Sequence, residues 1–187
     1  MEIEEIISQV YPLPGDSLEK LLENIEVITR SKGDILFRVD KVESDIYFIR
    51  KGMVRAYSYH HASEITFWFG KEGDTVISMR SYVLNKKGYE NIELLEDAEL
   101  YKLKNKNLQH LFDTDIHIAN WGRRFAETEL LKTEERLLLR QFKSASERYS
   151  TLISEYPELL QRVQLGYIAS YLGITQVSLS RIRKEIK

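Results

Sequence analysis

The pattern of hydrophobic and polar positions changes twice along the chain. Between Ile25 and Leu103, short runs rich in Val, Ile, Tyr and Phe alternate with turn residues, as in an antiparallel barrel or sandwich. On both sides of this segment, apolar residues recur at intervals of three and four, the spacing of amphipathic helices. The sequence therefore predicts an α+β fold with a β-rich segment between helical segments.

Residues 165–187 have the pattern of two short helices joined by a glycine. Gly173 stands where the first helix would end in a left-handed conformation, and Thr175 is a candidate N-cap for the second. The apolar face of the first helix consists of Leu165, Ile168, Ala169 and Leu172. That of the second consists of Leu179, Ile182 and Ile186. This pattern predicts a helix-turn-helix, with a plain helical hairpin as the alternative.

The polar face of the second helix suits double-stranded DNA. A glutamine can pair with adenine and an arginine with guanine, each worth roughly 1–3 kcal/mol of discrimination, so Gln176 and Arg181 are candidates for base contact. Hydroxyl and ammonium groups can hold phosphates without reading sequence. The candidate DNA-binding residues are Thr175, Gln176, Val177, Ser178, Ser180, Arg181 and Lys184.

A long helix is predicted over residues 115–132, capped by Asp113 or Thr114. One stripe of this helix, with a spacing typical of a coiled coil, consists of Ile116, Ala119, Arg123, Ala126 and Leu130. A second stripe, which would cover the β-rich segment, consists of Ile118, Trp121 and Phe125. A helix with two apolar faces must be buried on both, which favours a homodimer in which a second copy covers one of them. The alternative is that the two stripes form a single broad face that packs against the chain's own β segment.

Turn residues give further local predictions. Asp16 or Ser17 would cap a second N-terminal helix, and a helix would begin at Thr133 and run toward Pro157. Hairpins are predicted at Lys51-Gly52 and around Glu96-Asp97. The predicted division of the chain is a β-rich sensor domain with N-terminal helices (1–104), a connecting and dimerisation helix (105–132) and a DNA-binding domain (133–187).

The amino-acid composition narrows the range of possible functions. The chain has 187 residues and no cysteine, which excludes disulfides, thiolate zinc sites and cysteine-ligated iron–sulfur clusters. An acidic N-terminus and the lack of a long apolar run favour a cytoplasmic protein without a membrane segment. The net charge is −2, but residues 133–187 hold nine Lys/Arg against six Asp/Glu, a local charge of about +3 that fits DNA contact there.

The order of these predicted elements resembles the cyclic-AMP receptor / fumarate-nitrate regulator (Crp/Fnr) family of bacterial transcription factors. The resemblance rests mainly on IASYLGITQVSLSRIRKEI, with support from SKGDILFRVDKVESDIYFIRKGMVRAY and SASERYSTLISEYPELLQRV. It implies an N-terminal β-roll like a cyclic nucleotide-binding domain, a long dimerisation helix and a C-terminal winged-helix-like or helix-turn-helix domain. The implied partners are a second copy of the chain, a palindromic operator, RNA polymerase and a small-molecule effector.

Carried over by position, Gln176, Val177 and Arg181 would face base edges, and Thr175 and Ser178 would face phosphates. Val177 replaces the acidic residue of the best-known members, so we expect a different target sequence. Members that bind cyclic nucleotide use a Gly-Glu pair and an Arg-Ser or Arg-Thr pair. The position of the glutamate falls near Ser78 or Met79 here, and that of the arginine falls near Gly88. Arg80-Ser81 lies nearby but out of register, as a weak ligand-binding candidate. We therefore expect that cyclic AMP is not the effector.

Two other functions stay open from sequence. His60, His61 and Glu64 could form a cupin-like metal site of a β-roll enzyme. Adjacent residues of a strand point to opposite faces, however, which favours a solvated hairpin tip and neither a metal, a cofactor nor an enzyme. The other alternative is a ligand-sensing interaction module without DNA affinity, which salt-dependent binding to duplex DNA would distinguish.

Overall fold

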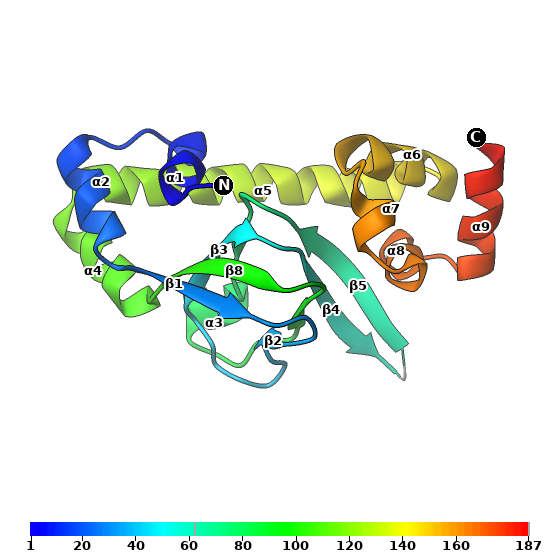
Figure 1. Cartoon of the computed structure of the whole chain (residues 1–187), viewed down its shortest axis with the longest axis horizontal. Helices are drawn as coiled ribbons and strands as arrows, with labels where there is room; N and C mark the ends of the chain where they lie inside the picture. The colour runs from blue at the N-terminus through cyan, green and yellow to red at the C-terminus, as the bar shows by residue number, and fades with distance from the viewer. Residues whose placement is uncertain (62, 187) are drawn as a thin grey trace.

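The computed structural model describes residues 1–61 and 63–186. Two antiparallel four-stranded sheets form a β-roll, and helices flank it at both ends and along one side (Figure 1). The sheet orders are β1-β8-β3-β6 and β2-β7-β4-β5. The strands are β1 (Ile25–Arg30), β2 (Ile35–Phe37), β3 (Ile46–Lys51), β4 (Val54–His60), β5 (Ser63–Gly70), β6 (Thr75–Val76), β7 (Asn91–Leu94) and β8 (Ala98–Leu103). The predicted β-roll between helical segments is confirmed.

Side chains from both sheets meet in the interior of the roll. The fully buried ones include Ile49, Val54, Leu94 and Leu100, which alternate with outward-facing positions or lie where a strand is covered on both faces. A short helix, α3 (Met79–Leu84), lies between β6 and β7. The hydrophobic runs of the sequence thus end up in the space between the two sheets.

Both hairpins predicted within the roll are wrong, although all four strands exist. β3 pairs with β8 and β6, while β4 pairs with β5 and β7, so the Lys51-Gly52 turn carries the chain from one sheet to the other. The turn between β7 and β8 does the same. Gly52 has φ 117, and a Cβ built on it would lie 2.7 Å from the Cβ of Ala98, so glycine serves close packing here.

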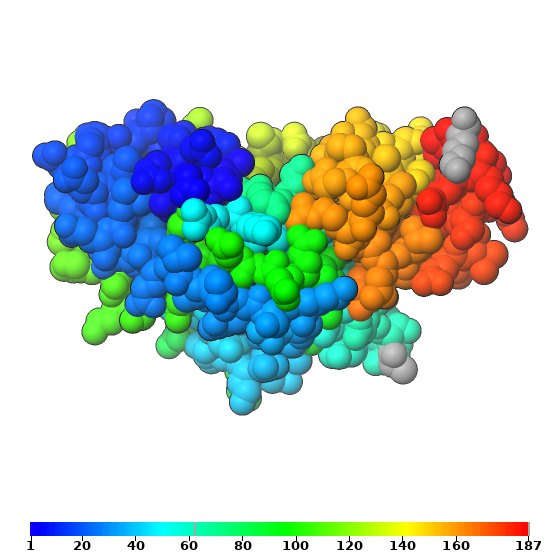
Figure 2. All heavy atoms as spheres, viewed as in Figure 1, coloured from blue at the N-terminus to red at the C-terminus, as the bar shows by residue number. Residues whose placement is uncertain are grey.

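Nine helices are described in residues 1–61 and 63–186. Besides α3, they are α1 (Ile3–Val10), α2 (Gly15–Leu22), α4 (Asn105–Thr114), α5 (Ile116–Phe142), α6 (Ala145–Glu155), α7 (Leu159–Arg162), α8 (Leu165–Leu172) and α9 (Gln176–Glu185). α1 and α2 pack on the N-terminal half of α5, where Trp121 is 2% exposed and donates its indole N–H to the carbonyl of Ile7 at 3.0 Å. Space-filling spheres show these helices joined to the roll along one continuous surface (Figure 2).

The caps of two helices differ from the prediction. Asp115, and not Asp113 or Thr114, caps α5, because its carboxylate accepts the amides of His117 and Ile118 at 3.0 and 3.3 Å. α2 begins after Pro14, so neither Asp16 nor Ser17 caps it. The hydroxyl of Ser17 instead donates to the same Asp115 carboxylate, a contact between residues that lie 98 positions apart.

α5 continues through Thr133, where a new helix was expected to begin. The hydroxyl of Thr133 donates to the carbonyl of Glu129 at 2.7 Å inside the helix, so this residue makes no cap. The helix ends at Phe142, and Ser144 starts α6 through a capping box with Glu147. The division of the chain at residue 133 stays a prediction.

The C-terminal helices share a hydrophobic core with the roll. Leu159, Ile168, Leu172 and Leu179 are almost completely buried, and Phe69 of β5 packs among them. Within residues 143–186 every described element is a helix, so this segment shows the helix-turn-helix without a β-hairpin wing. In the described part of the chain, no helix has both the length and the apolarity to span a lipid bilayer.

Candidate nucleic-acid interface

The turn between α8 and α9 has the geometry that the sequence predicts. Gly173 adopts the left-handed conformation, φ 68 and ψ 33, and the amides of Gly173 and Ile174 donate to the last carbonyls of α8 at 3.0 Å. Thr175 caps α9, because its hydroxyl accepts the amide of Ser178 at 3.1 Å. Ala169 is 2% exposed where the two helices meet. These local interactions hold α9 at a set angle to α8.

α9 lies at the outer end of the molecule (Figure 1). The residues of its polar face are exposed to solvent. Val177 is 72% exposed, and most of the other candidate DNA-binding residues are exposed as well. The exposed members of the set are Thr175, Gln176, Val177, Ser180, Arg181 and Lys184. On the opposite side of α9, Leu179 is 1% exposed in the core. The face that would enter a groove is therefore not covered by the rest of the chain.

Two candidate residues are engaged within the motif. The amide nitrogen of Gln176 lies so close to α8 that a Cβ built on Gly166 would be 2.5 Å from it. The hydroxyl of Ser178 lies 3.0 Å from that of Thr175 and is half-buried. Contact with DNA would require the Gln176 side chain to turn outward, whereas Ser180 and Arg181 already face solvent.

The charge of α9 favours a polyanion. Arg181, Arg183 and Lys184 stand against Glu185, which leaves the helix with a net charge of three minus one, or +2. Among the described residues, no carboxylate lies within ion-pair distance of these three cations. Cations that are not neutralised within the chain remain available for phosphates.

α8 packs against β5 of the roll, a contact that the sequence analysis missed. The hydroxyl of Ser170 accepts the amide of Thr66 and donates to the carbonyl of Glu64, both at 2.9 Å. Arg55 of β4, 2% exposed, lies 3.6 Å from the ring centre of Tyr167. The signal available in the sequence was a lone arginine in the apolar run of β4, since a buried guanidinium needs partners.

Arg55 joins three elements of the roll to α8. It forms ion pairs with Glu64 of β5 and Glu93 of β7 at 2.9 and 2.6 Å. Burial by itself would lower the pKa of Arg55, but the hydrogen bonds to the two carboxylates raise it. Its charge is thus neutralised inside the protein, and the aromatic face of Tyr167 covers it from the side of α8.

A second ion-pair cluster holds α7 against the roll. The guanidinium of Arg162 bonds to Glu72 at 2.8 Å and also to Glu96. Burial would raise the pKa of Glu72, but hydrogen bonds from Arg162 and from the amide of Gly52 lower it to about 2. The C-terminal helices therefore rest on the roll through two arginine clusters and a shared apolar core.

The proposed dimerisation face of α5 is exposed along most of its length. Ile116 and Leu130 are 69% and 71% exposed, and Leu137 continues the same row at 54%. Arg123, the charged member of the row, pairs with Glu127 at 2.5 Å in the same helix. The second predicted stripe is buried: Ile118 and Trp121 pack in the core, with Phe125 half-buried beside them.

The region that would hold a cyclic nucleotide is built differently. The structure brings Ser78 and Gly88 together, and a Cβ on Gly88 would lie 3.0 Å from the Ser78 hydroxyl. Glu90, 4% exposed, places its carboxylate beside them and accepts the amide of Tyr89 at 3.0 Å. Arg80 is exposed on α3, and the hydroxyl of Ser81 is committed to the carbonyl of Lys86 at 3.0 Å.

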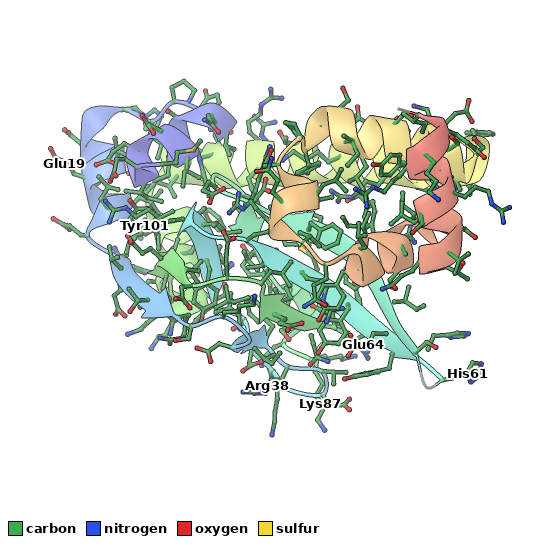
Figure 3. All side chains as sticks on the ribbon, turned by 45° about the vertical axis from the view of Figure 1, so that its right-hand side comes forward. Glu19, Arg38, His61, Glu64, Lys87 and Tyr101 are labelled. Atoms are coloured by element: carbon green, nitrogen blue, oxygen red, sulfur yellow. The ribbon has the colours of Figure 1, made fainter. Side chains whose placement is uncertain are left out.

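His60 and His61 lie at the exposed tip of the β4–β5 hairpin (Figure 3). Their ring centres lie 4.3 Å apart with the ring planes tilted by 59°, and Glu64 is held by Arg55 instead of by them. In the described ranges 1–61 and 63–186, no three His, Asp or Glu side chains are grouped as metal ligands. These three residues therefore do not form the inward-facing site that a cupin-like enzyme needs.

Comparison with known proteins agrees with this architecture. Residues 28–115 match the family described as "Cyclic nucleotide-binding domain". A search of curated proteins finds no match. Among solved structures, FixK2 from Bradyrhizobium japonicum has a TM-score of 0.73 at 20% identity, covering 87% of this chain and 84% of that one.

Two further structures are similar along most of their length. A protein from Eubacterium rectale assigned to the Crp/Fnr family has a TM-score of 0.71 at 16% identity, with 95% and 87% of the two chains covered. The c-di-GMP responsive global regulator CLP from Xanthomonas campestris has a TM-score of 0.68 at 18% identity, with 92% and 91% covered. The resemblance noted in the sequence is thereby confirmed at the level of the fold.

Proposed function

We propose that this chain, which has the fold of the Crp/Fnr regulators, is a dimeric DNA-binding regulator of transcription and not an enzyme. The observation that supports this most is the exposed basic face of α9, presented by a capped helix-turn-helix at the outer end of the molecule. α8 takes the contacts with the roll, so that α9 is free to enter a major groove. RNA polymerase is a further partner expected by analogy with such regulators.

Within α9 the proposed roles follow from exposure. Arg181, and Gln176 once it leaves Gly166, would contact base edges, and Val177 would contact a thymine methyl group. Thr175, Ser178, Ser180 and Lys184 would contact the backbone or neighbouring bases and set the register. Because the valine cannot accept a hydrogen bond, we expect an operator without a requirement for cytosine at that step.

A second copy of the chain would bind along α5. The row from Ile116 to Leu137 offers apolar side chains at heptad spacing, and a monomer would leave them in water. Two copies related by a twofold axis would present two α9 helices to successive turns of one palindromic operator.

We infer that the effector, where one acts, is not cyclic AMP. A cyclic phosphate needs a cation and free donors, whereas this site offers the buried carboxylate of Glu90 and the committed hydroxyl of Ser81. Arg80 is exposed on α3, and Gly88 supplies no side chain to hold a phosphate. The residues present therefore do not fit the cyclic nucleotide that the matched family takes its name from.

The test is selection of bound duplexes from a random DNA pool by the full chain. Affinity for the selected and for a scrambled duplex is then measured over a range of salt concentrations. We expect a steep loss of affinity with salt and a preference for one sequence. Arg181→Ala should weaken specific binding by roughly 1–3 kcal/mol and relax base preference at one position.

The matched control is Arg38→Ala, which removes an exposed arginine at the far end of the roll (Figure 3). It should leave DNA binding unchanged. If neither duplex is bound at low salt, the chain is an interaction module and this proposal is wrong. If Arg38→Ala and Arg181→Ala weaken binding equally, the face of α9 is not the contact surface.

A further inference from the structure

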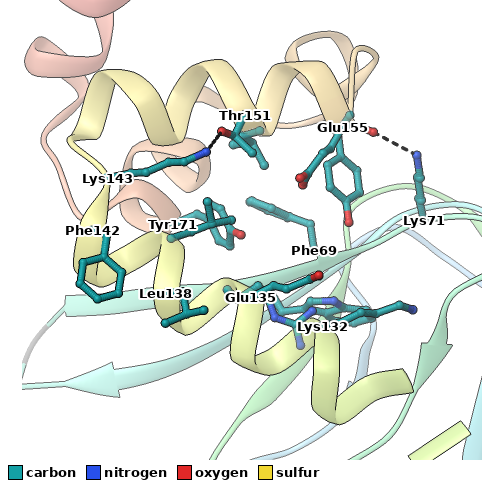
Figure 4. Close-up of a pocket in the computed structure, with 15 residues that line it drawn as sticks. Phe69, Lys71, Lys132, Glu135, Leu138, Phe142, Lys143, Thr151, Glu155 and Tyr171 are labelled. Atoms are coloured by element: carbon teal, nitrogen blue, oxygen red, sulfur yellow. Dashed lines mark hydrogen bonds between the residues drawn. The ribbon is translucent and has the colours of Figure 1, made fainter. Parts of the chain in front are cut away.

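A cavity of about 750 Å³ lies between the β-roll and the C-terminal helices (Figure 4). Trp68, Phe69 and Lys71 of β5 and the turn after it form one wall. The C-terminal half of α5 forms the second wall, and α6 with Tyr171 of α8 forms the third. Its volume falls within the roughly 300–1,000 Å³ that small-molecule sites occupy. It is separate from the cyclic nucleotide region around Gly88 and Glu90, none of whose residues line it.

Five of the fifteen residues that line the cavity are aromatic. The ring centres of Phe69 and Tyr171 lie 5.4 Å apart. The other aromatic residues of the lining are Trp68, Tyr156 and Phe142. Burial raises the pKa of Tyr156 to about 12, so its hydroxyl stays neutral at physiological pH. A flat apolar group would exclude water from these rings and gain both burial and aromatic contact.

The charge of the lining is positive. Four cationic side chains, Lys71, Lys132, Arg136 and Lys143, face two acidic ones, Glu135 and Glu155. A recess that shares Arg136 with the cavity adds Arg140 and Arg148. An anionic group would therefore be attracted, and a cationic one repelled.

Two of these cations are available to a ligand. Arg136 donates to the hydroxyl of Thr133 at 3.0 Å, and Lys143 donates to the hydroxyl of Thr151 at 3.0 Å. Neither is paired with a carboxylate in the part of the chain that the structure describes. Lys132, in contrast, already pairs with Glu129 at 2.7 Å. A carboxylate or sulfonate could replace the hydroxyls and form charge-assisted bonds.

The cavity does not compete with the proposed dimer interface. Leu139 lines the cavity while Leu137 continues the exposed row, and two residues correspond to about 200° around a helix. The row and the cavity thus lie on nearly opposite sides of α5. A ligand here would contact the roll, α5, α6 and α8 together, without displacing a partner helix.

We propose that this cavity binds an organic acid with an aromatic body. The binding itself does not depend on the DNA-binding function. Its use as the effector site rests on the proposed function, because the ligand would then bias how α6 and α8 sit on β5.

The test uses DNA-free full chain and isothermal titration with anilinonaphthalene sulfonate, an aromatic acid, beside its uncharged parent phenylnaphthylamine. We expect saturable binding of one sulfonate per chain and at least about tenfold weaker binding of the neutral compound. The double variant Arg136→Gln/Lys143→Gln should lower the affinity for the sulfonate at least about tenfold and leave the affinity for the neutral compound unchanged. The control, Arg124→Gln, alters an exposed arginine of α5 outside the cavity.

Equal affinity for the two compounds in the unmodified protein would overturn the proposal, and this comparison needs no variant to fold. So would equal effects of the double variant and the control, or several sulfonate molecules bound per chain without saturation. DNA affinity is measured separately with and without the sulfonate. If the chain binds no DNA either with or without the sulfonate but still binds the sulfonate, the regulator proposal is wrong and the ligand site stands.

Discussion

Replacing two leucines on the exposed row of α5 should separate the proposed dimer into monomers. Leu130 and Leu137 are 71% and 54% exposed in one chain, and each would be buried by the partner helix. Full burial of a leucine side chain is worth about 1.5–3 kcal/mol, so these exposed fractions correspond to about 2–4 kcal/mol per chain. Two chains lose about 4–7 kcal/mol, which raises the dissociation constant by roughly three to five orders of magnitude.

Sedimentation equilibrium over a range of protein concentrations measures this change. The variant is Leu130→Ser/Leu137→Ser. The matched control is Val83→Ser/Leu84→Ser, which replaces two aliphatic side chains on α3 that are 61% and 57% exposed. The control should keep the dissociation constant of the parent. The reasoning is refuted if the parent is a monomer at all concentrations, or if the control weakens association as much as the α5 variant does.

Three further predictions concern stability and are read from chemical unfolding. Gly173→Ala should lower the free energy of unfolding by about 1 kcal/mol, because φ is positive at that position. Gly15→Ala is the control and should not lower it, because a Cβ built on Gly15 has no atom within 4 Å. Equal effects of the two variants would contradict this reasoning. Thr175→Ala should cost about 0.5–2 kcal/mol through the lost cap, while Thr175→Ser should restore most of it; a neutral alanine variant would contradict the cap. The pKa of Glu72 is lowered from 4.5 to about 2 in the folded chain. Its contribution to the free energy of unfolding is therefore complete above pH 4.5 and is lost as the pH falls toward 2. Arg162→Met should flatten this acid-dependent loss, and an unchanged acid profile would show that the pair does not stabilise the fold.

The predictions that succeeded concern signals contained in a few consecutive residues. Gly173, Thr175 and the spacing of Leu172 and Leu179 describe one turn and two faces, and each hydrogen bond involved spans at most five positions. The buried stripe of Ile118 and Trp121 was predicted for the same reason, because helical periodicity alone decides which side chains share a face.

The predictions that failed needed the partner of a segment to be known. The Lys51-Gly52 turn has the residues of a hairpin, but strand pairing depends on which distant strand completes each sheet. The strands β7 and β8, which pair with β4 and β3, begin only at Asn91 and Ala98. The helix start at Thr133 failed because an N-cap residue also fits inside a helix when its hydroxyl bonds to a preceding carbonyl.

The amino-acid sequence by itself determined the strands, most of the helices, the turn of the helix-turn-helix and the positive charge of α9. These features follow from backbone preferences and side-chain spacing over a few residues. Only the tertiary structure decided which sheet each strand joins, how α8 rests on β5, and that Arg162 meets Glu72 across 90 positions. It also created the cavity that Trp68, Arg136 and Tyr171 share. Such contacts form only when segments far apart in the chain pack together, and no local pattern records which distant side chain will be the neighbour.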